Sequence, residues 1–113
     1  MNKYPALTET VFYILLSLSG PLHGYAIMQN IKALTNGRIN MGAGTLYGAL
    51  SALTEKEYIT EVRSDDPSKR LYIRTELGTE VIENEIKRFV AERRLFTGYN
   101  AYRLGNLFQK SSV

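Results

Sequence analysis

The chain of 113 residues is predicted to be mainly α-helical with a small β-hairpin, arranged as a winged helix-turn-helix followed by a long C-terminal helix. Three observations predict this class. Helical patterns of apolar residues come first, two short strand patterns follow, and a long apolar stripe of helical period fills the remainder. We therefore expect a winged helix-turn-helix domain over residues 1–75 and a C-terminal dimerisation helix over residues 76–113.

The first expected helix runs from Ala6 to Leu18, and apolar side chains surround more than half of it. Such a helix must be covered on two sides. The apolar run from Val11 to Leu18 is too short to cross a bilayer, so we expect a core helix and no membrane partner. Gly20 and Pro21 are expected to end it.

The second expected helix spans residues 24–34. Its inward residues are expected to be Ile27, Met28, Ile31 and Leu34. His23, the single histidine, should start this helix, because no Ser, Cys or acidic neighbour completes a nucleophilic site with it. Asn36 and Gly37 should end it, with the glycine in the left-handed conformation. A short extended link, Arg38–Met41, follows.

The third expected helix begins near Ala43 and has two contrasting faces. Leu46, Ala49, Leu50 and Leu53 share one face, and Gly44, Tyr47, Gly48, Ser51 and Glu55 share the other. A solvated helix would carry Lys and Glu outward, whereas small and hydroxyl-bearing side chains let a backbone approach another surface closely. This pattern predicts a docking face; ordinary core packing is the alternative.

Two strands are expected at residues 59–63 and 70–74, with turn residues between them. In the second strand, alternation should place Leu71 and Ile73 on one side and Arg70, Tyr72 and Arg74 on the other. The hairpin would be a wing with basic sides and an acidic tip. In a winged helix-turn-helix, the second helix of the pair enters the DNA major groove and the wing reaches the adjacent backbone.

The last expected helix begins after Thr75, a predicted N-cap. Gly98 is expected to kink or end it; continuation over residues 101–109 is the alternative. Its apolar stripe extends over some twenty residues, and we expect that nothing remaining in the chain covers it. We therefore predict a homodimer built from the first and last helices. The predicted dimerisation residues are Val11, Leu15, Val81, Ile82, Ile86, Phe89 and Val90.

Composition excludes several classes of function. The chain has no cysteine and a formal net charge of +3, which rules out disulfides and thiolate metal sites and suits a polyanionic partner. The segment 42–45 has glycines before a helix but lacks the lysine of a phosphate-binding loop. Neither Glu83 with Glu85 nor Asp65 with Asp66 makes a credible acid–base or metal pair. We expect no enzyme, no metal and no cofactor, and a cytoplasmic location.

Several motifs together resemble the PadR family of bacterial transcriptional regulators. They are Leu22-His23-Gly24-Tyr25-Ala26-Ile27, Gly44-Thr45-Leu46-Tyr47, and Arg70-Leu71-Tyr72-Ile73 followed by Thr75 and Gly78. The resemblance covers about residues 7–90, and the chain length matches the short branch with a single C-terminal helix. Three departures are Gly48 in place of a usual proline, Glu57 in place of a usual glycine, and the absence of Trp.

The resemblance implies a homodimeric repressor that binds double-stranded operator DNA and, in several members, releases it when a small molecule binds. It implies that Tyr25, Thr45 and Tyr47 lie near DNA, with Lys69 and Arg70 in the wing. Taken with the docking face, the predicted DNA-binding residues are Tyr25, Gly44, Thr45, Tyr47, Gly48, Ser51, Arg63, Lys69 and Arg70.

Aromatic residues are abundant in the C-terminal segment, where a dimer axis would bring two sets together. We expect a small aromatic effector to bind at Phe89, Arg93, Phe96, Tyr99 and Tyr102; tight packing without a cavity is the alternative. Two other functions remain open from the sequence. One is a winged helix used as a protein-interaction module, and the other is a small-molecule-binding dimer without an operator.

Overall fold

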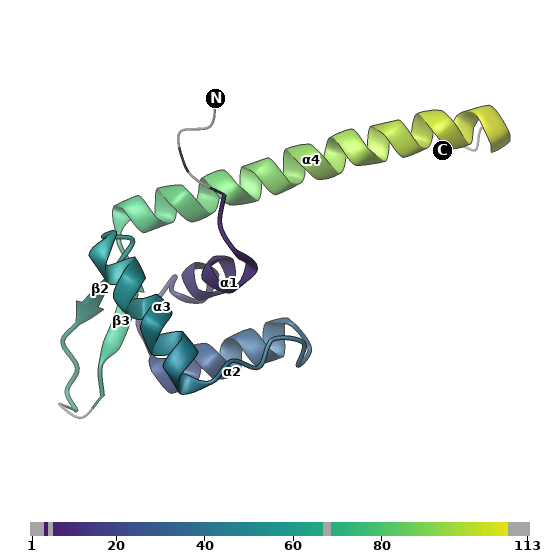
Figure 1. The fold of residues 1–113 in the computed structure, drawn as a ribbon. Coiled ribbons are helices and arrows are strands. Elements are labelled where there is room, and N and C mark those ends of the chain that lie inside the picture. Colours follow the sequence, from purple (N-terminus) through teal and green to yellow (C-terminus); the bar gives the residue numbers. More distant parts are fainter. Residues whose placement is uncertain (1–3, 5, 67–68, 109–113) are drawn as a thin grey trace. The chain divides into compact units, whose positions relative to one another are not determined.

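The computed structural model describes residues 4, 6–66 and 69–108, with side chains described as far as Arg93. In chain order the elements are α1 (Glu9–Ser17), β1 (Leu22–His23), α2 (Gly24–Leu34), α3 (Ala43–Glu55), β2 (Ile59–Val62), β3 (Leu71–Arg74) and α4 (Glu76–Phe108) (Figure 1). Two compact units, Met1–Glu83 and Asn84–Val113, divide the chain, so α4 begins within the first unit. The predicted fold class is confirmed.

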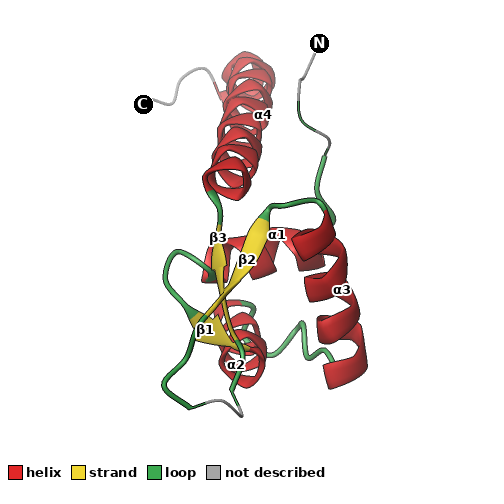
Figure 2. Ribbon diagram, turned by 90° about the vertical axis from the view of Figure 1, so that its left-hand side faces the viewer, coloured by secondary structure: helices red, strands yellow, loops and turns green. Residues whose placement is uncertain are grey.

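The sheet has a third strand that the sequence analysis missed. The strand order is β1-β3-β2, so β3 is the central strand and pairs antiparallel with both neighbours (Figure 2). Leu22 and His23 pair with Tyr72 and Leu71, respectively. A strand of two residues is too short to show an alternating pattern, and the expected extended link at residues 38–41 contains no strand.

Local hydrogen bonds fix where the first two helices begin. The Thr8 hydroxyl accepts from the Val11 amide at 3.2 Å, so α1 starts at Glu9 rather than at Ala6. Nδ1 of His23 accepts from the Ala26 amide at 3.1 Å, which confirms the predicted start of α2.

A residue in the left-handed conformation follows the C-terminal end of both α2 and α3. Asn36 has φ of 53° and Gly37 has φ of 82°, and the Gly37 amide donates to the Lys32 carbonyl at 2.7 Å. Gly37 is therefore left-handed as predicted, and Asn36 before it adopts a left-handed conformation as well. After α3, Glu57 adopts φ of 64°, and the Tyr58 amide donates to the Leu53 carbonyl at 3.0 Å. α3 thus ends in this motif although Glu57 replaces glycine.

The core of the first unit draws side chains from all three of its complete helices, two strands and the start of α4. Its buried members are Ile14, Leu15, Leu18, Ile27, Ile31, Leu46, Leu50, Leu53, Ile59, Tyr72, Val81 and Ile82. All of the inward residues predicted for α3 are buried or half-buried, with Ala49 partly covered. Leu34 was predicted to face inward, but its side chain is 51% exposed because α2 ends there.

The buried face of β3 is the one that carries Tyr72 and Arg74, and not the one that carries the two aliphatic residues. Tyr72 is only 5% exposed and lies in the core, whereas Leu71 and Ile73 are half-buried. Nη1 of Arg74 donates to the Leu15 carbonyl at 3.1 Å, and the Arg74 amide donates to the Leu18 carbonyl at 3.1 Å. The guanidinium therefore satisfies the carbonyl end of α1, where the helix dipole favours a cation.

The predicted N-cap Thr75 ties the start of α4 to the end of α3. Its hydroxyl accepts from the Gly78 amide at 3.0 Å and donates to the Glu57 carbonyl at 2.6 Å. Gly78 packs against the carbonyl of Tyr58, the residue after Glu57. A Cβ at position 78 would lie 1.9 Å from the Tyr58 carbonyl oxygen. Only glycine allows the two backbones to approach this closely.

Part of the apolar stripe of α4 is covered by its own chain. Leu15 is fully buried, and Val81 and Ile82 are each 1% exposed, all within the first unit. These three residues were predicted to lie in a dimer interface, and they are core residues instead. The expectation that nothing in the chain covers the stripe was therefore wrong for its first turns. The helix continues without a break through Gly98 to Phe108.

Candidate nucleic-acid interface

The outward face of α3 carries every residue that the sequence placed there. Gly44, Thr45, Tyr47, Gly48 and Ser51 are all exposed, while the opposite face is buried in the core. A Cβ added at Gly44 or Gly48 would meet no atom within 4 Å. Packing within the chain therefore does not require glycine at either position, and the helix presents an open backbone surface to the exterior.

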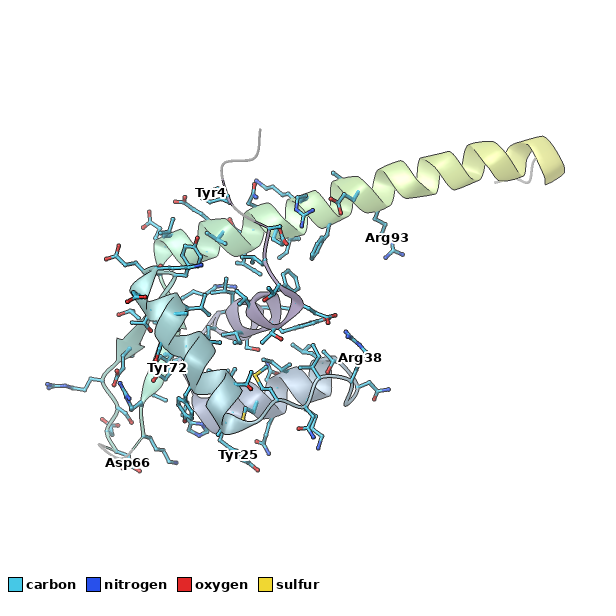
Figure 3. The ribbon with its side chains drawn as sticks, viewed as in Figure 1. Tyr4, Tyr25, Arg38, Asp66, Tyr72 and Arg93 are labelled. Carbon is cyan, nitrogen blue, oxygen red and sulfur yellow. The ribbon has the colours of Figure 1, made fainter. Side chains whose placement is uncertain are left out.

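Two tyrosines flank the start of α2. Tyr25 is 62% exposed and points away from the fold, with its hydroxyl accepting from Gln29 Nε2 at 3.1 Å (Figure 3). Tyr47 is 44% exposed and rests against Gly24, where a Cβ would lie 2.4 Å from the Tyr47 hydroxyl. The absence of a side chain at Gly24 thus leaves room for the ring of Tyr47, and sequence reasoning missed this role.

The tyrosines and the wing cations line one cleft. His23, Gly24, Tyr25, Tyr47, Lys69 and Arg70 surround a volume of about 530 Å³. This arrangement brings together residues from the start of α2, from α3 and from the segment before β3. Aromatic hydroxyls, a lysine and an arginine are the donors that proteins present to phosphate oxygens. The predicted DNA-binding residues Tyr25, Tyr47, Lys69 and Arg70 therefore share one site.

The wing carries Arg63 on one side and Lys69 and Arg70 on the other, and all three are exposed. Asp66 lies at its tip (Figure 3), and the Asp66 amide donates to the Ser64 hydroxyl at 3.1 Å. The tip therefore keeps its acidic residues, as the sequence predicted, and the cations lie nearer to the strands.

Arg70 is paired with a residue that the sequence analysis did not assign. Its Nε donates to Glu61 Oε2 at 3.2 Å and its Nη2 donates to Glu61 Oε1 at 2.9 Å. These hydrogen bonds lower the pKa of Glu61 and raise the pKa of Arg70. Burial raises the pKa of the neighbouring Tyr72, which is held neutral in the core. The net charge on this side of the wing therefore depends on the Glu61 carboxylate as well as on Lys69 and Arg70.

The second unit presents apolar side chains along one face of α4. Ile86, Phe89 and Val90 are 38%, 41% and 47% exposed, and the Arg88 guanidinium lies 5.3 Å from the centre of the Phe89 ring. Arg88 also forms a bidentate pair with Glu85, at 3.0 and 2.9 Å. Of the other predicted dimerisation residues, Val11 in α1 is half-buried.

The predicted effector residues are only partly described. Arg93 is exposed, as is Phe89, whereas the side chains of Phe96, Tyr99 and Tyr102 lie outside the described residues. Within the described residues, no helix is both long and apolar enough to pass through a bilayer. Over the same part of the chain, no three His, Asp or Glu side chains are grouped closely enough to hold a metal ion.

The fold and this surface together define a winged-helix protein with a nucleic-acid-binding face. Residues 12–84 match the transcriptional regulator PadR-like family, and the chain belongs to that family. It is therefore a DNA-binding transcriptional regulator and not an enzyme. The resemblance inferred from the motifs is confirmed.

Solved structures share the fold. A transcriptional regulator from Clostridium thermocellum is 22% identical, with a TM-score of 0.68 over 80% of this chain and 88% of that one. RosR of H. salinarum is 18% identical, with a TM-score of 0.67 over 88% and 96%. The PcaV transcriptional regulator of Streptomyces coelicolor, solved with its natural ligand, is 17% identical, with a TM-score of 0.67 over 90% and 69%.

One curated relative is closer in sequence over a shorter stretch. An uncharacterised 37.1 kDa protein of transposon TN4556 from Streptomyces fradiae is 38% identical over 66 residues. The match covers 58% of this chain and 18% of that protein, so the chain spans less than a fifth of its relative.

Proposed function

We propose that this regulator is a repressor that binds operator DNA as a homodimer and releases it when a small aromatic effector binds. The observation that carries the proposal is the exposed face of α3, whose glycines no internal packing requires, beside a cleft lined by Tyr47, Lys69 and Arg70. A repressor needs only to occupy its site, and the chain belongs to a family of transcriptional regulators.

The proposed division of labour follows from the chemistry of each element. Thr45, Tyr47 and Ser51 lie on the open face of α3 and would reach base edges and phosphates in the major groove. Arg63 and Lys69 lie in the wing, where they would neutralise backbone phosphates without reading sequence. Gly44 and Gly48 would let the helix backbone sit deep in the groove.

The homodimer is proposed from the exposed apolar face of α4. Ile86, Phe89 and Val90 recur at three- and four-residue intervals, which places them along one side of the helix. Exposed apolar stripes of this kind mark interaction surfaces. A two-fold axis through this face would present two copies of α3 to one side of DNA, about one helical turn apart.

The effector is proposed at the aromatic part of α4. Phe89 and Arg93 would contact it, together with Phe96, Tyr99 and Tyr102 from the part of α4 whose side chains are not described. PcaV, which has a similar fold, was solved with its natural ligand. The Thr75 hydrogen bonds join the start of α4 to the end of α3. A ligand that prefers one arrangement of α4 would therefore alter how the two copies of α3 meet DNA.

The test is selection of bound duplexes from a random pool by the purified full chain. We expect enrichment of a palindrome whose half-sites are about 10 base pairs apart, because two-fold protein symmetry imposes two-fold symmetry on the site. Tyr47→Ala should weaken binding to the selected duplex, and Lys32→Ala, on the exposed part of α2 away from the cleft, is the matched control. Failure to enrich any sequence would contradict the proposal.

A further inference from the structure

The guanidinium of Arg70 is already occupied in the free protein. Glu61 pairs with Tyr72 across the sheet, and Arg70 lies two residues before Tyr72, so both side chains emerge on the same face of the wing as diagonal neighbours. Nε and Nη2 of Arg70 donate to the two carboxylate oxygens of Glu61, at 3.2 and 2.9 Å. This is the bidentate geometry that an arginine would otherwise offer to a phosphate.

The pair lies on the side of the wing that faces α3. A groove of about 460 Å³ separates the two elements and is lined by Tyr47, Leu50, Ser51, Thr54, Glu55, Glu61, Arg70 and Tyr72. Among these lining residues Arg70 is the one cation, beside the carboxylates of Glu55 and Glu61. The Glu61 carboxylate therefore lines the groove between α3 and the wing, and a DNA backbone that contacted both elements would meet it.

Both partners of the pair are accessible to solvent. The side chain of Arg70 is 65% exposed and that of Glu61 is 45% exposed. Exposed ion pairs hold their partners weakly, so a phosphate can displace the carboxylate. Once displaced, the carboxylate would remain within reach of the same phosphate and would repel it.

We propose that Glu61 is a built-in competitor of the DNA backbone for Arg70 and that it limits affinity for every duplex, whatever its sequence. The inference rests on the proposed DNA binding and adds a residue that sets its strength. Arg70 must break its ion pair with Glu61 before it can contact a phosphate. The free energy of that ion pair is therefore lost from the free energy of the Arg70–phosphate contact. Because phosphate contacts carry no sequence information, operator and unrelated duplexes should be affected alike.

The experiment compares Glu61→Gln with Glu55→Gln by fluorescence anisotropy of a labelled duplex at several salt concentrations. Each variant removes one negative charge from the same groove, but among the described residues only Glu61 pairs with Arg70. Glu61→Gln should bind about two- to fivefold more tightly per chain than Glu55→Gln, the range expected for an exposed ion pair. Its salt dependence should be the steeper of the two.

Combining each variant with Arg70→Gln isolates the direct competition. Arg70→Gln should cost more affinity when Glu61→Gln is already present than in the wild type, because in the wild type it also removes the need to break the pair. In the Arg70→Gln background, Glu61→Gln should then behave like Glu55→Gln.

Opposite results would overturn the inference in recognisable ways. A larger cost of Arg70→Gln in the wild type would mean that Glu61 positions Arg70 for DNA. Equal costs, with Glu61→Gln matching Glu55→Gln, would mean that the pair is irrelevant to binding. If the wild type binds no duplex while thermal unfolding shows it folded, the proposed function itself fails.

Discussion

Glu57 is the residue whose backbone is most at odds with its side chain. It has φ of 64° at the end of α3, a conformation that costs a residue with a Cβ about 1 kcal/mol or more and glycine almost nothing. The carbonyl of Glu57 nevertheless accepts the Thr75 hydroxyl at 2.6 Å. That bond uses the backbone, so a residue of any type at position 57 could make it.

We therefore predict that Glu57→Gly stabilises the protein by about 0.5–1 kcal/mol, since relief of strain exceeds the added flexibility of the unfolded chain. The control is Lys56→Gly, because Lys56 has φ of −79° and gains nothing from glycine. Urea unfolding at fixed protein concentration measures the change in the free energy of unfolding for each variant. Equal effects of the two substitutions would contradict the explanation.

A second prediction concerns Gly78, which lies against the Tyr58 carbonyl. Gly78→Ala should destabilise the protein by about 2 kcal/mol or more, because its Cβ would lie 1.9 Å from a backbone oxygen that cannot move freely. Gly20→Ala is the matched control, since a Cβ there meets no atom within 4 Å. The difference in thermal midpoint between the two variants tests the close approach, and similar midpoints would disprove it.

At the scale of elements, α3 sacrifices helix stability on its outward face. Glycine within a helix costs about 0.5–1 kcal/mol relative to alanine, and the chain's own packing does not require Gly48. Gly48→Ala should therefore raise the free energy of unfolding by about that amount and yet weaken DNA binding severalfold, because the added methyl faces the proposed groove.

Stability is measured by unfolding and DNA affinity by duplex binding, both on the same Gly48→Ala sample. Ala52→Gly is the reverse control, as Ala52 is an exposed α3 residue that lines a different pocket, on the α1 side. It should lower stability and leave DNA binding unchanged at a temperature where the variant is folded. A stabilised Gly48→Ala variant that binds DNA as well as the wild type would remove the proposed docking role of this face.

At the scale of the whole molecule, the proposed homodimer would depend on the part of α4 beyond the first unit. Ile86 is 38% exposed on the apolar face of α4, so a charge there should disrupt a dimer without unfolding the first unit. We predict that Ile86→Glu sediments as a folded monomer and loses operator binding by at least tenfold.

The control for assembly is Ala91→Glu, which adds the same charge on the same helix at an exposed position outside the apolar stripe. It should remain dimeric and bind DNA. Sedimentation at micromolar concentration distinguishes the variants. A wild-type protein that is already monomeric under these conditions would refute the homodimer.

Local chemistry by itself determined a large part of this protein. The period of the apolar residues predicts that α2 and α3 are helices and gives α3 its buried and open faces, because side-chain spacing along a helix is set by the backbone. His23, Thr75 and the Asn36–Gly37 pair mark helix ends through bonds to residues only a few positions away. These signals need no knowledge of distant segments, and the family motifs add the class of function.

Tertiary structure decided what depends on distant partners. From the sequence, Leu15 of α1 and Val81 and Ile82 of α4 were predicted to lie in a dimer interface. They fill one core instead, because α1 and the start of α4 belong to the same packed unit. Tyr72 faces inward, with a relative exposure of 5%, because the helices of the first unit pack against the side of β3 that carries it. The Glu61–Arg70 pair and the contact of Gly78 with Tyr58 likewise join residues 9 and 20 positions apart. Such contacts follow from how elements pack, and no local pattern encodes them.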